Sequence, residues 1–397
     1  MKIWKFYRDI TEVGNIVFDG GASYASRVYA YFNGANWVVS EKDQRLFNIT
    51  KELKQDLQFY STFELSKEQY TEYVKRDGGI VFSENIDTSG PLYLRCDKGN
   101  PGELYREIEF HNAPTGLYGY EGLVNPSGDN IIDNLCIKYG LCNGIAIYGE
   151  ENRNIANDNN IIQNCEIGWT GGVEHDLKRA EGDVMVCGEG IVFKTNNNIF
   201  RNNYIYQNAA ACIVSEFVSN DYIPTKTMSK NTIIEDNLFE RSQDALWFWD
   251  NGYMGGDIVF WENTKITGNY VMYMGYGWSG DPKFMSPVNT FHKDGDTWSF
   301  AIGGTSAGVK NMVVKDNVFY LTNGGYLVHV PDMQERLCDV TFSGNTYVQS
   351  DNRKILSHEI SKNSLTVGAI QKDIERFLGD KKAVVLPPSV PPVRQSK

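Results

Sequence analysis

Two acidic residues, Glu216 and Asp250, follow short apolar segments that align with each other along the chain. When Ala211 is set against Ala245, Glu216 falls opposite Asp250. Neighbouring strands lie about 4.8 Å apart, so this alignment predicts two carboxyl groups about 5 Å apart. Such a pair can supply a general acid and a nucleophile or base, because one carboxylate raises the pKa of the other. The alternative is that both are solvated carboxylates at strand ends.

A second acid–base cluster, Glu174-His175-Asp176, lies in a long loop segment. Glu174 and Asp176 are candidate catalytic groups, because a loop can carry a general acid or base over a groove. The alternative is a solvated charge run, since the acidic and basic residues continue to position 183. His292 and His329 are single histidines, which are more often structural than catalytic.

Aromatic residues make up 13% of the chain and concentrate near these acids. Period-two alternation turns Trp247 and Trp249 outward on the strand that ends at Asp250. Flat aromatic faces suit the apolar CH faces of sugar rings. Alternatively, residues 251–262 fold over both tryptophans as a satellite core. The full set of substrate-binding candidates comprises Trp247, Trp249, Trp169, Lys194, Tyr276, Trp278, Asp281 and His292.

These residues sit in a repeat of the form Ile-x-x-(Asn/Asp/Gly)-Asn-x-apolar. Successive anchor positions are 28 to 48 residues apart, a range typical of stacked structural units. The recurrent Asn predicts an internal ladder, because its amide can bond turn backbone and the equivalent Asn one unit away. The anchor positions are Leu135, Cys165, Asn203, Asn237, Asn269, Asn317 and Asn345.

Each repeat contains three short β-rich runs, which predicts an all-β fold: a right-handed parallel β-helix solenoid with three short strands per coil. Helical repeats are disfavoured because the runs are short and rich in Ile, Val, Phe and Asn. A propeller would need stronger hairpin signals. The residues expected to face the core on the third strands are Ile145, Ile147, Ile191, Phe193, Leu246 and Phe248.

The chain divides into four parts within this scheme. Residues 1–130 are expected to form N-terminal coils with an inserted loop region, which contains a helix from Ser66 to Gly79. Residues 131–350 form the regular coils and are continuous with 1–130 in one domain. Residues 351–386 form a strand and helix cap, in which 366–378 place Val367, Ile370, Ile374 and Phe377 on one helical face. Residues 387–397 form a mobile Pro-rich tail.

The composition excludes several classes of binding partner. The net charge is −12 and no basic cluster occurs, which argues against nucleic acid. No apolar stretch reaches the roughly 18 residues of a membrane span, and no signal peptide opens the chain. Neither a cofactor nor a metal is expected, since no Cys/His cluster has metal-binding spacing. The chain has 7 cysteines, and reduced thiols inside the coils indicate a cytoplasmic location, or a secreted one if an N-terminal part precedes this chain. The thiols expected inside or beside the coils are Cys136, Cys165, Cys187 and Cys212.

Several segments spread over the chain resemble bacterial right-handed parallel β-helix proteins of the pectate-lyase-like superfamily, in particular a carbohydrate-active group placed with glycoside hydrolases. The resemblance implies a carbohydrate substrate and further N-terminal coils, in a preceding segment or a partner chain. It leaves the oligomeric state open. The matching segments are VGNIVFDGG at 13–21, GNPGELYREIEF at 99–110, CEIGWTGG at 165–172, GEGIVF at 188–193, YGW-S at 276–279 and LGDKKA at 378–383.

The chain departs from this group where the group carries acids. Val192, Ala210 and Trp247 stand where the related proteins carry Glu, Asp and Glu, and the GW-S loop continues as GDPK. Three functions therefore compete. The first is a glycoside hydrolase using Glu216 and Asp250. The second is a non-catalytic carbohydrate-binding or tailspike-like module. The third is a polysaccharide lyase or epimerase, which needs a cation near a uronate, and Lys194 is the one basic residue on the third strands. A purely structural solenoid would leave the aromatic groove unexplained.

Overall fold

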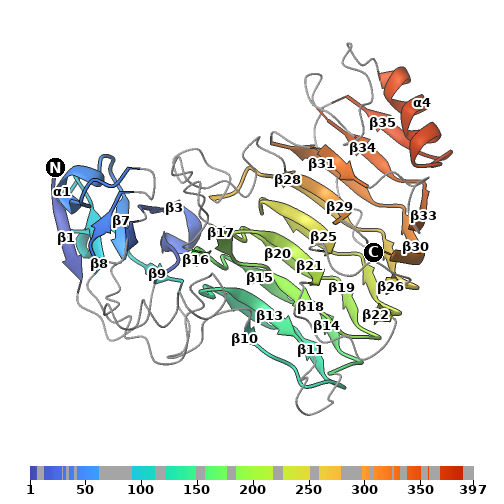
Figure 1. Ribbon diagram of the computed structural model, residues 1–397, viewed down its shortest axis with the longest axis horizontal. Coiled ribbons are helices and arrows are strands. Elements are labelled where there is room, and N and C mark those ends of the chain that lie inside the picture. The colour runs from blue at the N-terminus through green and yellow to red at the C-terminus, as the bar shows by residue number, and fades with distance from the viewer. Residues whose placement is uncertain are drawn as a thin grey trace.

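The structure, a computed structural model, describes residues 1–6, 13–28, 30–32, 35–39, 43–61, 92–111, 122–148, 157–176, 185–217, 227–250, 259–278, 297–304, 308–323, 326–330, 338–349, 356 and 367–387. Over these ranges the protein is mostly β, and most of its strands belong to three long parallel sheets (Figure 1). None of the helices in these ranges has the length and apolar character of a membrane span.

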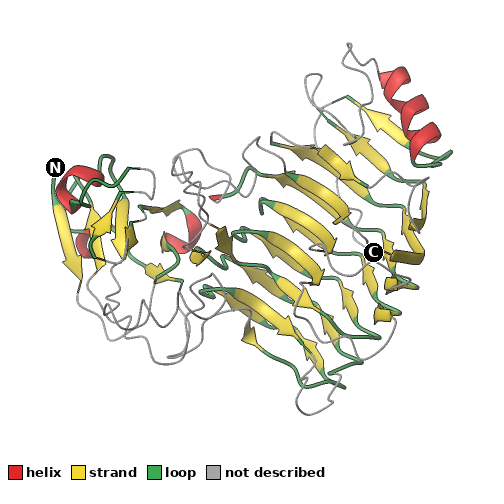
Figure 2. Cartoon of the chain, in the orientation of Figure 1, coloured by secondary structure: helices red, strands yellow, loops and turns green. Residues whose placement is uncertain are grey.

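The three sheets share one order of strands along the chain. A strand of the first sheet is followed by one of the second and then by one of the third, and this order recurs from β11 to β32. Figure 2 shows the resulting rows of strands, with the helix α4 at one end. This arrangement is that of a stacked β solenoid.

The first sheet consists of β11 (Ile131–Asp133), β14 (Ile161–Gln163), β19 (Ile199–Arg201), β23 (Ile233–Glu235), β27 (Lys265–Thr267), β30 (Gly308–Lys315), β26 (Val259–Glu262) and β22 (Thr227–Lys230), with β33 (Cys338–Ser343) paired to β30. The second consists of β12 (Cys136–Lys138), β15 (Glu166–Gly168), β20 (Tyr204–Tyr206), β24 (Leu238–Glu240), β28 (Tyr270–Met274), β31 (Val318–Thr322), β34 (Thr346–Val348) and β35 (Val384–Leu386). The third consists of β10 (Gly122–Val124), β13 (Asn143–Ile147), β18 (Ile191–Phe193), β21 (Ala211–Phe217), β25 (Asp244–Asp250), β29 (Trp298–Gly304) and β32 (Tyr326–His329).

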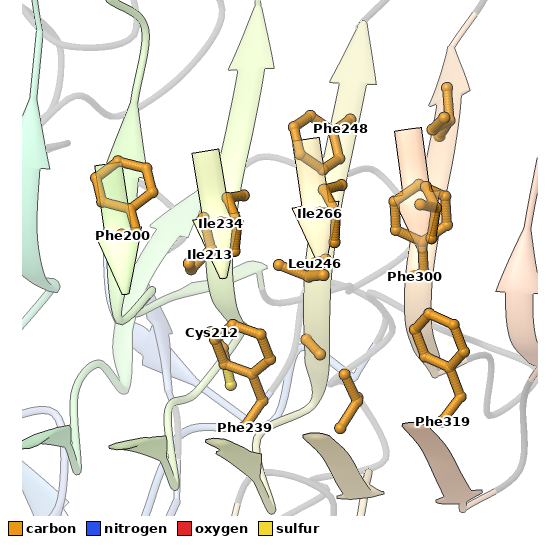
Figure 3. Packing of buried hydrophobic residues seen from close by; sticks show 14 of the residues in the cluster. Phe200, Cys212, Ile213, Ile234, Phe239, Leu246, Phe248, Ile266, Phe300 and Phe319 are labelled. Carbon is orange, nitrogen blue, oxygen red and sulfur yellow. The ribbon is translucent and has the colours of Figure 1, made fainter. Parts of the chain in front are cut away.

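The main hydrophobic core lies between these sheets. Apolar side chains at equivalent positions of successive strands stack on one another, as Ile213, Leu246 and Phe300 do in Figure 3. The six core-facing residues predicted on the third strands are all buried there, which confirms that part of the prediction. Cys165 and Cys212 are buried free thiols as predicted, whereas Cys136 is an exposed one. The side chain of Cys187 lies outside the described residues.

The predicted Asn ladder is present in the core. The N–H of each anchor residue from Cys165 to Asn317 donates to the side-chain oxygen of the anchor Asn in the next coil, at 2.9–3.0 Å. From Asn203 onward each anchor Nδ2 also donates to that same oxygen. The ladder ends at Asp380, whose carboxylate accepts from Asn345 N and Nδ2. The NH₂ and the C=O group of each ladder Asn side chain are therefore hydrogen-bonded inside an otherwise apolar core.

The residue before each anchor explains the Asn/Asp/Gly position of the repeat. Its φ lies between 53° and 72° in every coil, a left-handed conformation that Gly, Asn and Asp adopt most readily. The residues concerned are Asn134, Asn164, Asn202, Asp236, Gly268, Asp316 and Gly344.

The C-terminal end of the stack is covered as predicted. The helix α4 (Val367–Phe377) packs on β35, and Gly379 follows it with a φ of 68°. Ile374 of the helix and Leu378 just after it are buried, and Ile370 packs against the core, whereas Phe377 is 38% exposed. The predicted face is thus correct at Ile370 and Ile374 and wrong at Phe377. Residues 388–397 of the predicted tail lie outside the described residues.

Where the sequence predicts N-terminal coils, the described strands before β10 form separate sheets, which we call the N-terminal unit. Figure 1 shows this unit beside the ribbon β16 (Val173–Asp176) and β17 (Met185–Cys187). The predicted helix from Ser66 to Gly79 lies outside the described residues. The elements of the unit are β1 (Ile3–Phe6), β2 (Ile16–Phe18), η1 (Asp19–Gly21), β3 (Ser23–Tyr24), β4 (Ser26–Arg27), β5 (Tyr31–Phe32), β6 (Trp37–Val38), α1 (Ile49–Glu52), β7 (Gln58–Ser61), β8 (Leu92–Arg95), α3 (Pro101–Leu104) and β9 (Ile108–Phe110).

Candidate functional site

The third sheet has one face toward the core and one toward the outside. Val192, Val214, Trp247 and Ala301 alternate with the core residues along their strands and form a separate apolar cluster. We call this side the outer face. Trp247 and Trp249 belong to it, as the alternation predicts.

The register of the third sheet corrects the predicted carboxylate pair. Ala211 pairs with Asp244, so Glu216 lies opposite Trp249, while Asp250 lies opposite Phe217. Glu216 and Asp250 are therefore one residue out of register, and the alignment that placed them side by side is wrong. The side chain of Asp250 lies outside the described residues.

A shorter turn causes this shift. The connection to the third strand spans residues 207–210 in one coil and 241–243 in the next. The N–H groups of Gln243 and Asp244 both point at the carbonyl oxygen of Ala210, at 3.0 and 3.2 Å, so the shorter turn is absorbed at this place. Because side chains alternate along a strand, a shift of one residue changes which side chains share a face.

Among the described acidic residues near the outer face, Glu189 has the most perturbed pKa. It lies two residues before the start of β18, and its Oε2 accepts from the N–H of Gly188 at 3.2 Å. Its backbone N–H donates to Asn143 Oδ1, and its carbonyl accepts from Gly144 and from the Thr170 hydroxyl. Burial, and then the charge of Glu216, raise the pKa of Glu189 to about 7, while Lys194 acts in the opposite direction. The carboxyl group is thus about half protonated at neutral pH.

Lys194 and Glu216 are the two charged residues that act on Glu189. Val192 pairs with Val214; Lys194 lies two residues beyond Val192, just after β18, and Glu216 lies two residues beyond Val214, on β21. The Lys194 ammonium also lies over the ring of Tyr148, 5.5 Å from its centroid. Together with Glu189, these residues form a group of charges that we call the carboxyl site: Glu189, Lys194 and Glu216.

Aromatic rings continue the outer face beyond the carboxyl site. Trp249 stacks on Trp298 with centroids 5.7 Å apart and planes at 10°, and His329 stacks on Trp298 at 5.1 Å. Trp247 is only 5% exposed, whereas Trp249 and His329 are partly exposed. A Cβ on Gly303 would stand 1.9 Å from the Trp249 ring, so the missing side chain there makes room for the indole. Trp249 is therefore held in one position at the edge of the cluster.

Trp169 and Trp278, predicted to bind substrate beside Trp247, lie elsewhere. Both are buried, and their rings pack around His111, with the His111 and Trp278 centroids 5.6 Å apart. The Trp278 indole N–H donates to the carbonyl of Gln207 at 2.7 Å. Their expected place on the groove with Trp247 is wrong, because these rings fill the contact between the solenoid and the N-terminal unit.

His111 is buried within this second cluster. Its Nδ1 lies 3.0 Å from the carbonyl oxygen of Gly171, and a carbonyl only accepts, so Nδ1 carries the proton. Its Nε2 has no hydrogen-bond partner. Burial lowers the pKa of His111 to about 4, against a smaller opposite effect of the Gly171 bond.

The remaining predicted site residues divide between described and undescribed parts of the chain. Tyr276 is 45% exposed and packs edge-on against Tyr273, outside the third sheet. Glu174 and Asp176 lie on β16, but their side chains, like the whole of Asp281 and His292, lie outside the described residues. Among the residues that are described, no group of three His, Cys, Asp or Glu side chains gathers as a metal site.

Sequence reasoning missed Glu189, Trp298 and His111. Glu189 had a signal, since a charged residue between two glycines directly before a buried strand is unusual. The sequence carries no such signal for Trp298 or His111, because the residues that they contact come from distant segments of the chain. A comparison of the chain with protein-family models, curated proteins and solved structures finds no match.

Proposed function

We propose that the protein is carbohydrate-active, and that it is a glycoside hydrolase whose reaction takes place at the carboxyl site on the outer face of the third sheet. The observation that carries this proposal is the pKa of Glu189, which burial and the charge of Glu216 raise to about 7. Glycoside hydrolysis requires one protonated and one ionised carboxyl group on the two sides of the scissile bond. The roles assigned by sequence to Glu216 and Asp250 thereby pass to Glu189 and Glu216.

In this mechanism Glu189 is the general acid. Its proton goes to the glycosidic oxygen as the bond from that oxygen to the anomeric carbon breaks, and the sugar alcohol leaves. Glu216 is the ionised partner that either attacks the anomeric carbon or removes a proton from the attacking water. Lys194 supplies a positive charge that favours the ionised form of a nearby carboxylate.

The aromatic cluster supplies the binding surface in this proposal. Trp249 and His329 reach solvent on the same face as Glu216, and Glu216 is the register partner of Trp249. Sugar rings bind through apolar CH faces next to aromatic groups, with a few polar groups setting their orientation. Trp247 and Trp298 hold these rings in place from below.

The proposal includes the finer description of the fold as a right-handed parallel β-helix with three strands per coil. It is supported by the recurrent order of first, second and third sheet and by parallel pairing throughout them. Connections between parallel strands are right-handed in nearly all known cases. A groove on one face of such a stack is a frequent place for function, although the fold alone does not define it.

The test is release of reducing sugar from a panel of neutral and acidic polysaccharides by the wild type, Glu189→Gln and Glu216→Gln. Glu235→Gln, on the first sheet, is the matched control. We expect both site variants to lose activity at least about 100-fold, the usual share of a catalytic acid or base, while the control keeps it. Wild-type activity should fall as the pH rises above about 7, because Glu189 then loses its proton. Full activity in both site variants would refute the assignment.

Carbohydrate binding without cleavage is the second candidate. The fixed position of Trp249 over Gly303 favours it, since a rigid aromatic edge binds sugars with little loss of entropy. A panel glycan that binds the wild type and is recovered intact, with binding lost in Trp249→Ala, would replace the hydrolase by a binding module. An unsaturated, ultraviolet-absorbing product from uronate polymers would instead identify a lyase.

A further inference from the structure

The N-terminal unit meets the solenoid through backbone that lacks side chains. A Cβ on Gly14 would stand 2.3 Å from the carbonyl oxygen of Gly171, and one on Gly172 would stand 2.2 Å from that of Gly14. Gly172 also has a φ of 99°, which residues with a side chain rarely adopt. Two chain segments far apart in sequence thus touch backbone to backbone, which no other residue type would allow.

The backbone contact between these glycines extends to the carboxyl site through Gly188. A Cβ on Gly188 would stand 2.3 Å from the Cα of Gly171, so these two residues are also in backbone contact. The N–H of Gly188 is the donor to Glu189 Oε2. Gly14, Gly171, Gly172 and Gly188 therefore form one continuous contact, the glycine seam, from the N-terminal unit to the Glu189 carboxyl group.

Two buried polar side chains of the N-terminal unit hold the seam closed. Arg27 Nη1 donates to the carbonyl oxygen of Gly172 at 2.8 Å, and His111 Nδ1 donates to that of Gly171 at 3.0 Å. Both side chains are buried, and hydrogen bonds of this kind are costly to break without access to water. The N-terminal unit is thereby attached at Gly171, which contacts Gly188, and at Gly172, the next residue in the chain.

We propose that the N-terminal unit is a positioning element of the carboxyl site: through the glycine seam it fixes the Gly188 N–H against Glu189 and limits the access of water to the half-buried carboxyl group. This inference rests on the site named in the proposed function but not on the reaction. Its residues touch neither substrate nor reacting atoms, and they act through Glu189. The N-terminal unit is then required for the acid–base property of the site as well as for stability.

The consequence is a change in the proton affinity of Glu189 when the seam opens. Burial is the largest cause of the raised pKa of Glu189, so entry of water lowers that pKa toward the ordinary value of a glutamate. Of the described charged groups that act on Glu189, Glu216 lies on β21 of the third sheet and Lys194 directly follows β18, with its N–H bonded to the Ile147 carbonyl of β13. They stay in place when the N-terminal unit moves, so their contributions do not change.

The experiment is an NMR titration of ¹³C-labelled glutamate carboxyl groups in the full chain between pH 4 and 9, with Glu189 assigned by its absence in Glu189→Gln. The seam variant is Gly172→Ala. The control is Gly20→Ala, because Gly20 also has a positive φ, 64°, but a Cβ there would meet nothing within 4 Å. We expect the pKa of Glu189 to fall by at least about one unit in Gly172→Ala, which is a tenfold loss of proton affinity. In Gly20→Ala the pKa should stay near 7.

A second variant, Arg27→Met, tests the same idea without adding an atom to the seam, and it decides the matter if Gly172→Ala does not fold. Hydrogen exchange of residues 13–28 reports whether the seam has opened. An opened seam with an unchanged Glu189 titration overturns the proposal, as does an equal change in the Gly20→Ala control. The titration needs no substrate, so the result stands whether or not sugar is released in the activity assay.

Discussion

Replacing Glu189 by Gln should change how the stability of the protein depends on pH. The pKa of Glu189 is raised to about 7 in the folded protein, against an ordinary glutamate value of 4.5. Because the folded state holds the proton more tightly than the unfolded chain, ionisation costs folding free energy. The cost is absent below pH 4.5, grows as the pH rises, and is complete above pH 7.

The size of this cost follows from the same pKa values. One pH unit of pKa difference corresponds to about 1.4 kcal/mol, which sets an upper value of roughly 3 kcal/mol. Part of the Glu189 side chain reaches solvent, which screens its charge, so we expect about 2 kcal/mol. Glutamine has no proton to lose and avoids this cost at every pH.

Urea unfolding followed by tryptophan fluorescence at pH 5 and pH 8 measures the effect. We take the unfolding free energy of Glu189→Gln minus that of the wild type at each pH. This difference should be about 2 kcal/mol larger at pH 8 than at pH 5. Glu235→Gln, which carries the same substitution on the first sheet, should show no such change. A Glu189→Gln difference that is constant with pH, or that changes in the opposite direction, would refute the environment assigned to Glu189.

Three further predictions concern the core and the seam. Asn237→Ala should cost at least about 3 kcal/mol in urea unfolding, because Asn203 N, Asn203 Nδ2 and the Phe200 carbonyl each lose a buried partner worth about 1–3 kcal/mol. A loss below about 1 kcal/mol would contradict a satisfied ladder. Asp380→Asn should lower the melting temperature, because an amide NH₂ then faces one of the N–H groups that donate to the carboxylate. An unchanged melting temperature would count against the role of Asp380 as the terminal acceptor. The pKa of His111 is lowered to about 4, so the stability that neutral His111 contributes is present above pH 6.5 and lost as the pH falls toward 4. In thermal unfolding, His111→Gln should therefore lose less stability than the wild type over that range. An equal loss in the two proteins would contradict this.

The ladder and the inward faces of the third strands follow from the sequence because they repeat. The Asn column predicts its own hydrogen bonds, and the period-two alternation places Leu246 and Phe248 in the core. The register of neighbouring third strands does not follow. Ala211 and Ala245 are equally far from their anchor residues, yet a turn one residue shorter sets Ala211 beside Asp244. Turn geometry of this kind depends on contacts such as those to the Ala210 carbonyl, which no local pattern reveals.

The carboxyl site was found in the sequence only in part. Glu216, Lys194 and Trp249 stand on strands whose faces can be predicted. Glu189 depends on burial next to Gly188 and on the charge of a residue 27 positions later in the chain. Trp169 and Trp278 were misplaced for the same reason, since their burial against His111 depends on where the N-terminal unit docks.

The direction of the Asn ladder bears on the chemical ageing of the protein. Every internal anchor amide donates through Nδ2 and accepts through Oδ1, whereas the terminal position at Asp380 only accepts. Spontaneous deamidation of an internal Asn replaces a donor by an acceptor and produces an end of the ladder in the middle of the stack. Damage to one buried amide therefore removes one hydrogen-bond step of the ladder between coils that the three parallel sheets still join, while deamidation of the exposed Asn row, such as Asn231 and Asn263, affects only a surface bond.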